Sequence, residues 1–498
     1  MSEHPVSPRL SSNRVEVDGP KRSAATEAVR RLLRGCGFAE AGPANDNGPA
    51  SRAVCVVQVD NPLFGVGQRT GGLRRSAILD SATSLARQGG GTLVLVTDQT
   101  PMAAPSADPD HAARQAGDLQ WWQQISARFA PRGVRMNTIR VGYAPFLGHA
   151  LSQPAEAELL SHQIVRRPVV EADLQAALTL LFSSVPSTMV GEILPLDGGL
   201  GTTLVSTSKP GSVRPDHSTE PPAAPWNLEG RTILVAGASS GIGAATAIEL
   251  ARRGADLVLL ARRKRELDEV AAAITEHFGS LVRTVDADLA DPDTPELALA
   301  RAFSSAGRVD DLVYTAGMLV RDDPREDTVA QRERAYRVNT LAYADMAERL
   351  ARRWATDGHR GSIVGVSSSS AEIALVPGLY SYSSSKAAME HLSLQLAISL
   401  ARHRIRVNAV VPGFVDTPMA ATADPAFVSV SMRRVPVAHP SEPEDLAAVI
   451  AYLASPASAM ISGARLRVCG GLATLGPLPA LTGSSRHAVR ATATAVAR

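Results

Sequence analysis

The chain has 498 residues, of which 45% are hydrophobic, and its formal net charge is +2 at pH 7. At about 100–200 residues per domain this length predicts two or three domains, and the near-neutral charge gives no reason to expect nucleic acid. The three cysteines, Cys36, Cys55 and Cys469, are too few and too scattered for a disulfide framework or a metal site. The sequence shows no signal peptide and no run of about 18 apolar residues. We therefore expect a cytoplasmic protein with no membrane segment and no metal.

Three segments have the composition of tails or linkers. Residues 1–50 are rich in Ser, Pro, Gly and Asn, which predicts a disordered tail in which only 26–35 could form a short basic helix. Residues 206–227 contain five prolines and are predicted to be a Pro/Ser-rich linker. Residues 477–498 are predicted to be a flexible C-terminal tail. Two compact blocks remain, 51–205 and 228–476.

Both blocks alternate short β-branched runs with longer helical patterns, which is typical of an α/β protein with a parallel sheet. In the second block the glycine-rich stretch GIGAATAIELARRG predicts a helix over 241–254. The predicted strands of that block lie at 231–237, 256–261, 311–317, 362–368, 405–413 and 464–470.

The first turn of the second block, VAGASSGIGAATA, has the residues of a nucleotide site. Gly237, Gly241 and Gly243 lie between a predicted strand and a predicted helix. Glycine allows a tight turn and lets a pyrophosphate approach the helix N-terminus, where free N–H groups favour anions. The pattern therefore predicts a bound dinucleotide.

The end of the next predicted strand selects between the two nicotinamide dinucleotides. A carboxylate there would bind the ribose 2′-hydroxyl of NAD, but Ala261 takes that place and Arg262 and Arg263 follow. Guanidinium groups suit a 2′-phosphate, so the sequence favours NADP, with Arg262 as the stronger candidate. The alternative is two solvated arginines at a strand end.

Tyr382 and Lys386 are four residues apart, so they share one face of a helix. A tyrosine hydroxyl ordinarily has a pKa near about 10, and a nearby ammonium and a cationic nicotinamide would bring that pKa toward neutrality. Such a tyrosine can give its proton to a carbonyl oxygen while hydride arrives from the cofactor.

Together these motifs resemble the short-chain dehydrogenase/reductase family over residues 228–474. The resemblance implies a Rossmann-like, doubly wound parallel sheet that binds NADP(H). It implies catalytic roles for Tyr382 and Lys386 and a proton-relay role for Asn339 in RVNT, whereas Thr315 departs from the family's asparagine. The cofactor-binding residues that it implies are Gly237, Ser239, Ser240, Gly241, Ile242, Gly243, Arg262, Arg263, Asp288, Leu289, Ala316, Gly317, Tyr382, Lys386, Pro412, Gly413, Val415 and Thr417.

The catalytic serine of the family is not fixed by the sequence GVSSSSAEIALVPGLYSY. Counting forward from the strand selects Ser368, whereas counting back from Tyr382 selects Ser369. We favour Ser369 narrowly. Its hydroxyl would hydrogen-bond to the substrate carbonyl where negative charge develops.

The first block repeats part of the second with a period of about 271 residues, far too long for a solenoid. HAARQAGDL (111–119) aligns without a gap on YSSSKAAME (382–390), and the alignment continues from there to Tyr143. His111 replaces the tyrosine, Gln115 replaces the lysine, and the segment 98–100 replaces the serine loop. The strand 53–59 matches the fourth strand of the family, so the first three strands are predicted to be missing.

We therefore expect 51–205 to be a truncated, degenerate half-domain without catalysis, although His111 leaves a different chemistry open. We hypothesise that it packs on 228–476 as a pseudo-dimer through helices near 76–88, 111–129, 340–354 and 381–401. Trp121 and Trp122 would anchor that face, or would belong to the ordinary core.

A truncated α/β block, a linker and a complete reductase resemble the high-molecular-weight 3-oxoacyl-acyl-carrier-protein reductases, which implies 3-oxoacyl thioesters as substrates and acyl-carrier protein or coenzyme A as partner. The predicted lid, 414–440, contains apolar residues such as Met419 and Met432. Arg433 and Arg434 could meet a carrier phosphate or simply be solvated.

The sequence thus predicts an NADP(H)-dependent ketoreductase that forms a homo-oligomer, with Tyr382 as general acid. A reductase of a polyketide, aromatic ketone or other secondary metabolite is the first alternative. An NADP-binding scaffold or redox-sensing partner is the second, although such a protein has no need for the full Tyr-Lys-Asn set.

Overall fold

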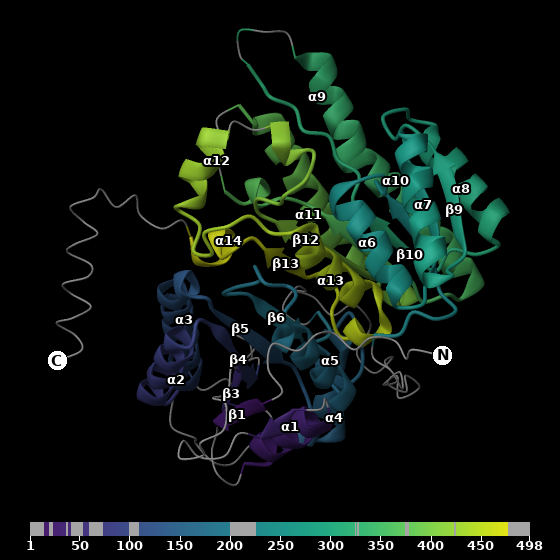
Figure 1. The fold of residues 1–498 in the computed structure, drawn as a ribbon. Helices are drawn as coiled ribbons and strands as arrows, with labels where there is room; N and C mark the ends of the chain where they lie inside the picture. The colour runs from purple at the N-terminus through teal and green to yellow at the C-terminus, as the bar shows by residue number, and fades with distance from the viewer. Residues whose placement is uncertain are drawn as a thin grey trace.

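The computed structural model describes residues 14–18, 23–35, 38–40, 53–58, 73–98, 109–199, 226–323, 325, 328–373, 378–422 and 425–476. These residues form two α/β units, each built on one parallel sheet (Figure 1). The predicted linker, apart from 226–227, and the predicted C-terminal tail lie outside the described residues.

The second unit has the predicted doubly wound sheet, with strand order β13-β12-β11-β10-β7-β8-β9. Its strands are β7 (Thr232–Ala236), β8 (Asp256–Ala261), β9 (Val282–Asp286), β10 (Asp311–Tyr314), β11 (Ser362–Val366), β12 (Arg406–Pro412) and β13 (Arg465–Val468). Every pairing between them is parallel. The chain order reverses direction between β7 and β10, and the carboxyl ends of the strands around such a switch point form the ligand crevice.

Apolar residues cover both faces of this sheet. Successive residues of β7 alternate between two hydrophobic clusters, with Ile233 and Val235 on one side and Leu234 and Ala236 on the other. The first cluster holds α6 (Gly241–Arg252), α7 (Lys264–Phe278) and α13 (Pro443–Ala454), and the second holds α8 (Thr294–Ala306), α10 (Ala342–Asp357) and α11 (Tyr380–Leu400).

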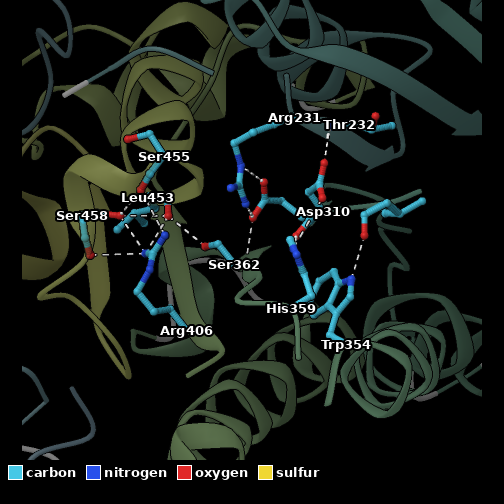
Figure 2. A network of polar contacts seen from close by, with 12 residues as sticks. Arg231, Thr232, Asp310, Trp354, His359, Ser362, Arg406, Leu453, Ser455 and Ser458 are labelled. Carbon is cyan, nitrogen blue, oxygen red and sulfur yellow. Dashed lines mark hydrogen bonds and ion pairs between the residues drawn. The ribbon is translucent and has the colours of Figure 1, made fainter. Parts of the chain in front are cut away.

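A polar network closes the amino ends of these strands, opposite the glycine turn (Figure 2). Arg231 makes two hydrogen bonds of 2.7 Å to Asp311, whose Oδ1 also accepts from Ser362 N at 2.8 Å. Arg406 donates to Leu453 O at 2.9 Å and to Ser458 Oγ at 2.7 Å. These charge-assisted bonds satisfy buried groups that would otherwise be costly, so this end is structural.

The first unit has six strands in the order β2-β1-β3-β4-β5-β6. They are β1 (Arg14–Asp18), β2 (Ala39–Glu40), β3 (Ala53–Gln58), β4 (Gly91–Asp98), β5 (Val134–Val141) and β6 (Ile193–Leu196). Its helices are α1 (Ala24–Gly35), α2 (Arg75–Arg87), α3 (Pro109–Phe129), α4 (Gln153–Ser161) and α5 (Glu171–Phe182).

Two expectations about the N-terminal region are wrong. The segments 14–18, 23–35 and 38–40 belong to the fold rather than to a disordered tail, and β1 and β2 take the sheet positions that β7 and β8 have in the second unit. Among the described residues only β9 lacks a counterpart, so the first unit is not a half-sheet. The possible helix at 26–35 is part of α1, an amphipathic helix whose apolar residues, including Val29, Leu32 and Leu33, recur at helical spacing and are buried.

The repeat has kept its structural side chains. Arg135 donates to Ser183 O at 2.7 Å, as Arg406 in the second unit donates to Ser455 O at 3.0 Å. The side-chain amide nitrogens of Asn137 and Asn408 each donate a hydrogen bond to a backbone carbonyl of a following loop, at 2.8 and 3.0 Å respectively. These equivalent bonds show that the two units share one fold down to individual buried polar groups.

The units meet through their edge strands and the helices beside them, not through the expected bundle of four helices. Gly470 N donates to Thr188 O at 2.9 Å and Gly198 N donates to Met460 O at 3.0 Å. The same offset in sequence numbering separates Thr188 from Met460 and Gly198 from Gly470, so the two bonds are a reciprocal pair. In Figure 1, α2 and α3 lie far from α10 and α11. Trp122 is 1% exposed and belongs to the core of the first unit.

Candidate active site

The turn after β7 is shaped as a cradle for a phosphate. Gly237 has a φ of +90°, and a Cβ there would lie 2.6 Å from Ala316 N. Gly243 faces the carbonyl oxygen of Gly237 so closely that a Cβ would collide with it. Only glycine fits either position, and the N-terminus of α6 begins directly after the turn at Gly241. The residues present therefore fit a dinucleotide pyrophosphate.

An arginine reaches over this turn from the end of β8. Arg263 donates from one guanidinium nitrogen to Ser239 Oγ at 3.0 Å and to Ser240 Oγ at 2.6 Å. Arg262 precedes it and is exposed. Of the two predicted arginines, both exposed, the contacts bring Arg263 rather than the favoured Arg262 to the cradle. Asp288 follows β9 and pairs with Arg334 at 2.6 Å, and Leu289 beside it is buried.

Lys386 and Tyr382 come together on α11 at the carboxyl ends of the strands. Lys386 is 3% exposed, and its Nζ donates to Val366 O at 2.8 Å. Burial lowers the pKa of Lys386 to about 8, against the opposing effect of Glu390. A Cβ on Gly317 would lie 3.3 Å from Lys386 Nζ, so the glycine leaves room for the ammonium.

Two effects act on the pKa of the Tyr382 hydroxyl. Burial raises this pKa, and a side-chain hydrogen bond with Ser368 lowers it. The expected fall of this pKa toward neutrality depends on a cationic nicotinamide as well as on Lys386, so it stays a prediction. A protonated tyrosine is the form that donates to a carbonyl oxygen.

The structure separates the two candidate serines. Ser368 bonds with Tyr382 and also caps the turn Ser369–Ala371, since Ser370 N donates to Ser368 Oγ at 3.2 Å. Ser369 is 2% exposed and lies inside that turn. These contacts favour Ser368 over Ser369, and the choice of catalytic serine stays a prediction.

Asn339 lies in a short π-helical segment, Arg337–Leu341, between α9 (Val329–Tyr336) and α10. Its Oδ1 accepts from Met318 N at 2.7 Å, and its Nδ2 donates to Met318 O at 3.0 Å and to Ser385 Oγ at 2.9 Å. Asn339 therefore fixes the segment after Gly317 against α11. π-helical turns of this kind occur often at functional sites.

The segment after β12 closes over the cradle. Thr417 lies against the glycine turn, because a Cβ on Gly241 would be 3.1 Å from Thr417 Cγ2. Val415 bridges to Ser441, and Gly413 lies close to Cys469. Pro412 is the last residue of β12. The implied cofactor residues of this segment are thus brought to the same sheet edge as Ala316 and Ile242.

Thr315, the departure from the family pattern, has a structural role here. Its hydroxyl donates to Ala236 O at 2.7 Å and lies beside Gly237 and Gly243. It thereby joins the ends of β7 and β10 beneath the cradle, so the departure leaves the cofactor turn intact.

Sequence reasoning missed Glu390. Its Oε1 accepts from Ser367 Oγ at 2.5 Å, it is 4% exposed, and it faces Lys386 from the next turn of α11. The signal was available, because a carboxylate four residues after a lysine shares its helix face.

At the position of the first unit that corresponds to Lys386, Gln115 donates to Asp98 O at 2.7 Å. The side chain of His111 and residues 99–100 lie outside the described residues. Among the described residues, no cluster of His, Cys, Asp or Glu could hold a metal ion. No described helix is long and apolar enough to cross a membrane.

Comparisons with known proteins agree with this site. Residues 237–473 match the family described as enoyl-(acyl carrier protein) reductase. An L-rhamnose 1-dehydrogenase (NAD(P)(+)) of Sphingomonas sp. is 37% identical over 249 residues, which are 49% of this chain and 97% of that protein. A cis-4-hydroxycyclohexanecarboxylate dehydrogenase of Sinomonas cyclohexanicum is 38% identical over 245 residues, 48% of this chain and 96% of that protein. A solved structure of an actinorhodin polyketide ketoreductase with NADPH has a TM-score of 0.46 and 28% identity, and the match covers 49% of this chain and 97% of that one.

The chain belongs to the short-chain dehydrogenase/reductase family, and its second unit is an oxidoreductase of that family.

Proposed function

We propose that the protein is an NADP(H)-dependent carbonyl reductase that reduces 3-oxoacyl thioesters. The observation that carries this proposal is the constellation at the carboxyl ends of β7, β10 and β11. There Tyr382 is bonded to Ser368, Lys386 is fixed by Val366 O, and Arg263 lies over the glycine turn.

Arg263 supports NADP over NAD. Its guanidinium bonds to the hydroxyls of Ser239 and Ser240, and these three groups would hold a 2′-phosphate. The preceding strand ends in Ala261, so it offers no carboxylate to bind a free 2′-hydroxyl or to repel a phosphate.

Each residue of the site has a separate role in carbonyl reduction. The dinucleotide supplies a hydride when it is bound. Ser368 donates to the substrate carbonyl oxygen and orients it, and Tyr382 gives its proton to that oxygen as negative charge develops. The ammonium of Lys386 stabilises the phenolate that Tyr382 leaves behind. Asn339 fixes the neighbouring backbone at Met318, from which a water-mediated relay can restore the proton.

Apolar side chains near the lid support an acyl substrate. Met432, Val435, Cys469 and Leu472 form a buried cluster against Ile373, which follows the serine turn. Arg433 and Arg434 are exposed beside it, where they suit the phosphate of coenzyme A or of a carrier arm. The matching family is described as enoyl-(acyl carrier protein) reductase, which supports a carrier-bound acyl substrate without specifying the 3-oxo group.

A cyclic or aromatic ketone is the second candidate. It is favoured by the relative that is a cis-4-hydroxycyclohexanecarboxylate dehydrogenase. An NADP-binding scaffold without catalysis would not need the paired Tyr382 and Ser368 or the buried Lys386.

The first unit is proposed to be a non-catalytic partner within the same chain. It has Gln115 in place of the lysine, yet it keeps the structural residues Arg135 and Asn137. The reciprocal bonds of Gly470 to Thr188 and of Gly198 to Met460 support a pseudo-dimer through the edge strands. A homo-oligomer of such chains remains our expectation.

The test is a substrate panel with purified full-length protein and NADPH. Acetoacetyl-CoA and an acetoacetyl thioester of a small thiol represent the thioester class, and a cyclohexanone carboxylate and a ketose represent the alternatives. The proposal requires kcat/KM for the thioesters to exceed that for the other ketones. Preference for the cyclic ketone would replace the substrate assignment and leave the reductase assignment standing.

A further inference from the structure

Glu192, in the non-catalytic unit, is a buried carboxylate that faces the catalytic unit. It lies directly before β6 and is 3% exposed. Its Oε2 accepts from the backbone N of Arg467 at 3.1 Å, and its Oε1 lies 3.5 Å from the Arg467 guanidinium. Figure 1 shows β6, which follows Glu192, and β13, which contains Arg467, facing each other across the boundary.

The same arginine holds the segment that follows the catalytic serine. Arg467 donates from Nε and Nη2 to the two carboxylate oxygens of Glu372, at 2.7 and 2.8 Å. Glu372 comes directly after the turn Ser369–Ala371, and its N donates to Ser369 O at 3.1 Å. Two parallel bonds of this kind fix the orientation of the Glu372 carboxylate as well as its distance from the Arg467 guanidinium. The Arg467 guanidinium therefore determines where the turn capped by Ser368 ends.

Glu192 belongs to a charge cluster that includes Lys386. Arg465 lies 3.7 Å from Glu372 and 3.4 Å from Glu390, and Glu390 also faces Lys386, so without Glu192 three cations face two glutamates. Glu192 adds a third carboxylate, and its burial raises its pKa to about 7, against the lowering effect of Arg467.

Removing one partner of a buried ion pair usually costs stability, but Arg467 keeps Glu372 as a partner when Glu192 is changed. The repeat shows what the fold itself requires at this position, because the residue equivalent to Glu192 in the second unit is Ala464. Both residues donate their backbone N to an asparagine Oδ1 at 3.0 Å, Asn137 and Asn408 respectively. The fold therefore does not require a carboxylate at this position, and its presence calls for another role.

We propose that Glu192 is a positioning residue for the catalytic unit. It holds the Arg467 guanidinium in place, and the bonds of that guanidinium to Glu372 set the position of the loop that carries Ser368. This inference rests on the proposed reductase function. It gives the non-catalytic unit a defined part in the reaction, since the site is incompletely supported without it.

The test compares Glu192→Gln with Ser187→Ala in the full-length protein. Ser187 bonds to Asp445 across the same boundary, with Oγ to Oδ2 at 3.0 Å, but it has no link to the serine turn. A shift of about 1 Å at a reacting group can lower the reaction rate about 100-fold. We therefore expect Glu192→Gln to lower kcat about tenfold, with an unchanged Kd for NADPH and an unchanged Tm. Ser187→Ala should leave kcat unchanged.

Two further measurements separate positioning from simple interface stability. The effects of Glu192→Gln and Glu372→Gln on kcat should not add, because both act on one contact chain. Hydrogen exchange in the backbone of residues 367–373 should become faster in Glu192→Gln while that of α6 does not. This second readout needs no turnover, so it distinguishes failure of the inference from failure of the proposed function.

The inference is overturned if Glu192→Gln keeps kcat and the exchange of 367–373 unchanged. It is also overturned if Glu192→Gln and Ser187→Ala lower kcat in parallel with Tm. If Glu192→Gln does not fold, Arg467→Lys takes its place, since it keeps the charge and removes the two-pronged bond.

Discussion

Lys386 and Gln115 occupy equivalent positions in the two units, and each donates a side-chain hydrogen to the last carbonyl of a neighbouring strand. Lys386 Nζ reaches Val366 O at 2.8 Å, and Gln115 Nε2 reaches Asp98 O at 2.7 Å. Each bond ties its helix to a strand end, but the two carbonyls are not equivalent. The register pairs Ser362 with Arg406 and Thr92 with Arg135, so Asp98 corresponds to Ser368 rather than to Val366. The positive charge is present in only one of the two units.

Removing the tie should affect the two units differently. Gln115→Leu is expected to change kcat by less than about twofold, because Gln115 has no reacting partner, while Lys386→Met should lower it about 100-fold or more. Initial rates of NADPH oxidation with each variant check this. A large loss of kcat in Gln115→Leu at unchanged Tm would contradict the assignment of the first unit as non-catalytic.

The two serines give a second prediction. Ser368→Ala removes the donor that faces Tyr382 and should lower kcat about 100-fold to 1,000-fold, the range seen when one such donor is lost. Ser369→Ala keeps that donor, so its kcat should stay within about threefold of wild type. Parallel kinetics of the two variants decide the matter, and the reverse order of effects would restore Ser369 as the catalytic serine.

Arg263 gives a prediction about cofactor choice. Arg263→Ala should raise the KM for NADPH about 10-fold to 100-fold, which corresponds to the about 1.5–3 kcal/mol of a hydrogen bond to a charged group. The KM for NADH should hardly change, because NADH lacks the 2′-phosphate. Arg262→Ala serves as the matched control from the adjacent exposed position. Equal losses for both cofactors would show that Arg263 supports the turn rather than the phosphate.

The pH dependence follows from Lys386, whose pKa is lowered to about 8 by burial. Below that pH the ammonium is charged and can stabilise the Tyr382 phenolate, and above it the charge is lost. For reduction, kcat/KM should therefore be level below pH 8 and fall about tenfold per pH unit above it. A profile that stays level to pH 10 would mean that the free enzyme holds Lys386 charged, contrary to this account.

Much of the site could be predicted because its chemistry is local in the chain. The glycine turn, Tyr382 with Lys386, and Asn339 each lie within one short motif. What could not be predicted depends on distant contacts or on loop register. Arg467 meets Glu192 from 275 positions away, and counting along the serine loop leaves Ser368 and Ser369 both open. Flanking Ser, Pro and Gly hid the strand β1 and the packing of α1 into the fold, because composition is averaged over a window wider than either element.

The most direct test of the account compares wild type with Tyr382→Phe in NADPH oxidation with an acetoacetyl thioester. The account predicts that wild type consumes NADPH, while the variant loses kcat by about 100-fold to 10,000-fold and still binds NADPH with a similar Kd. Turnover that survives in Tyr382→Phe would contradict the assignment of Tyr382 as the acid. No turnover by wild type would contradict the thioester assignment.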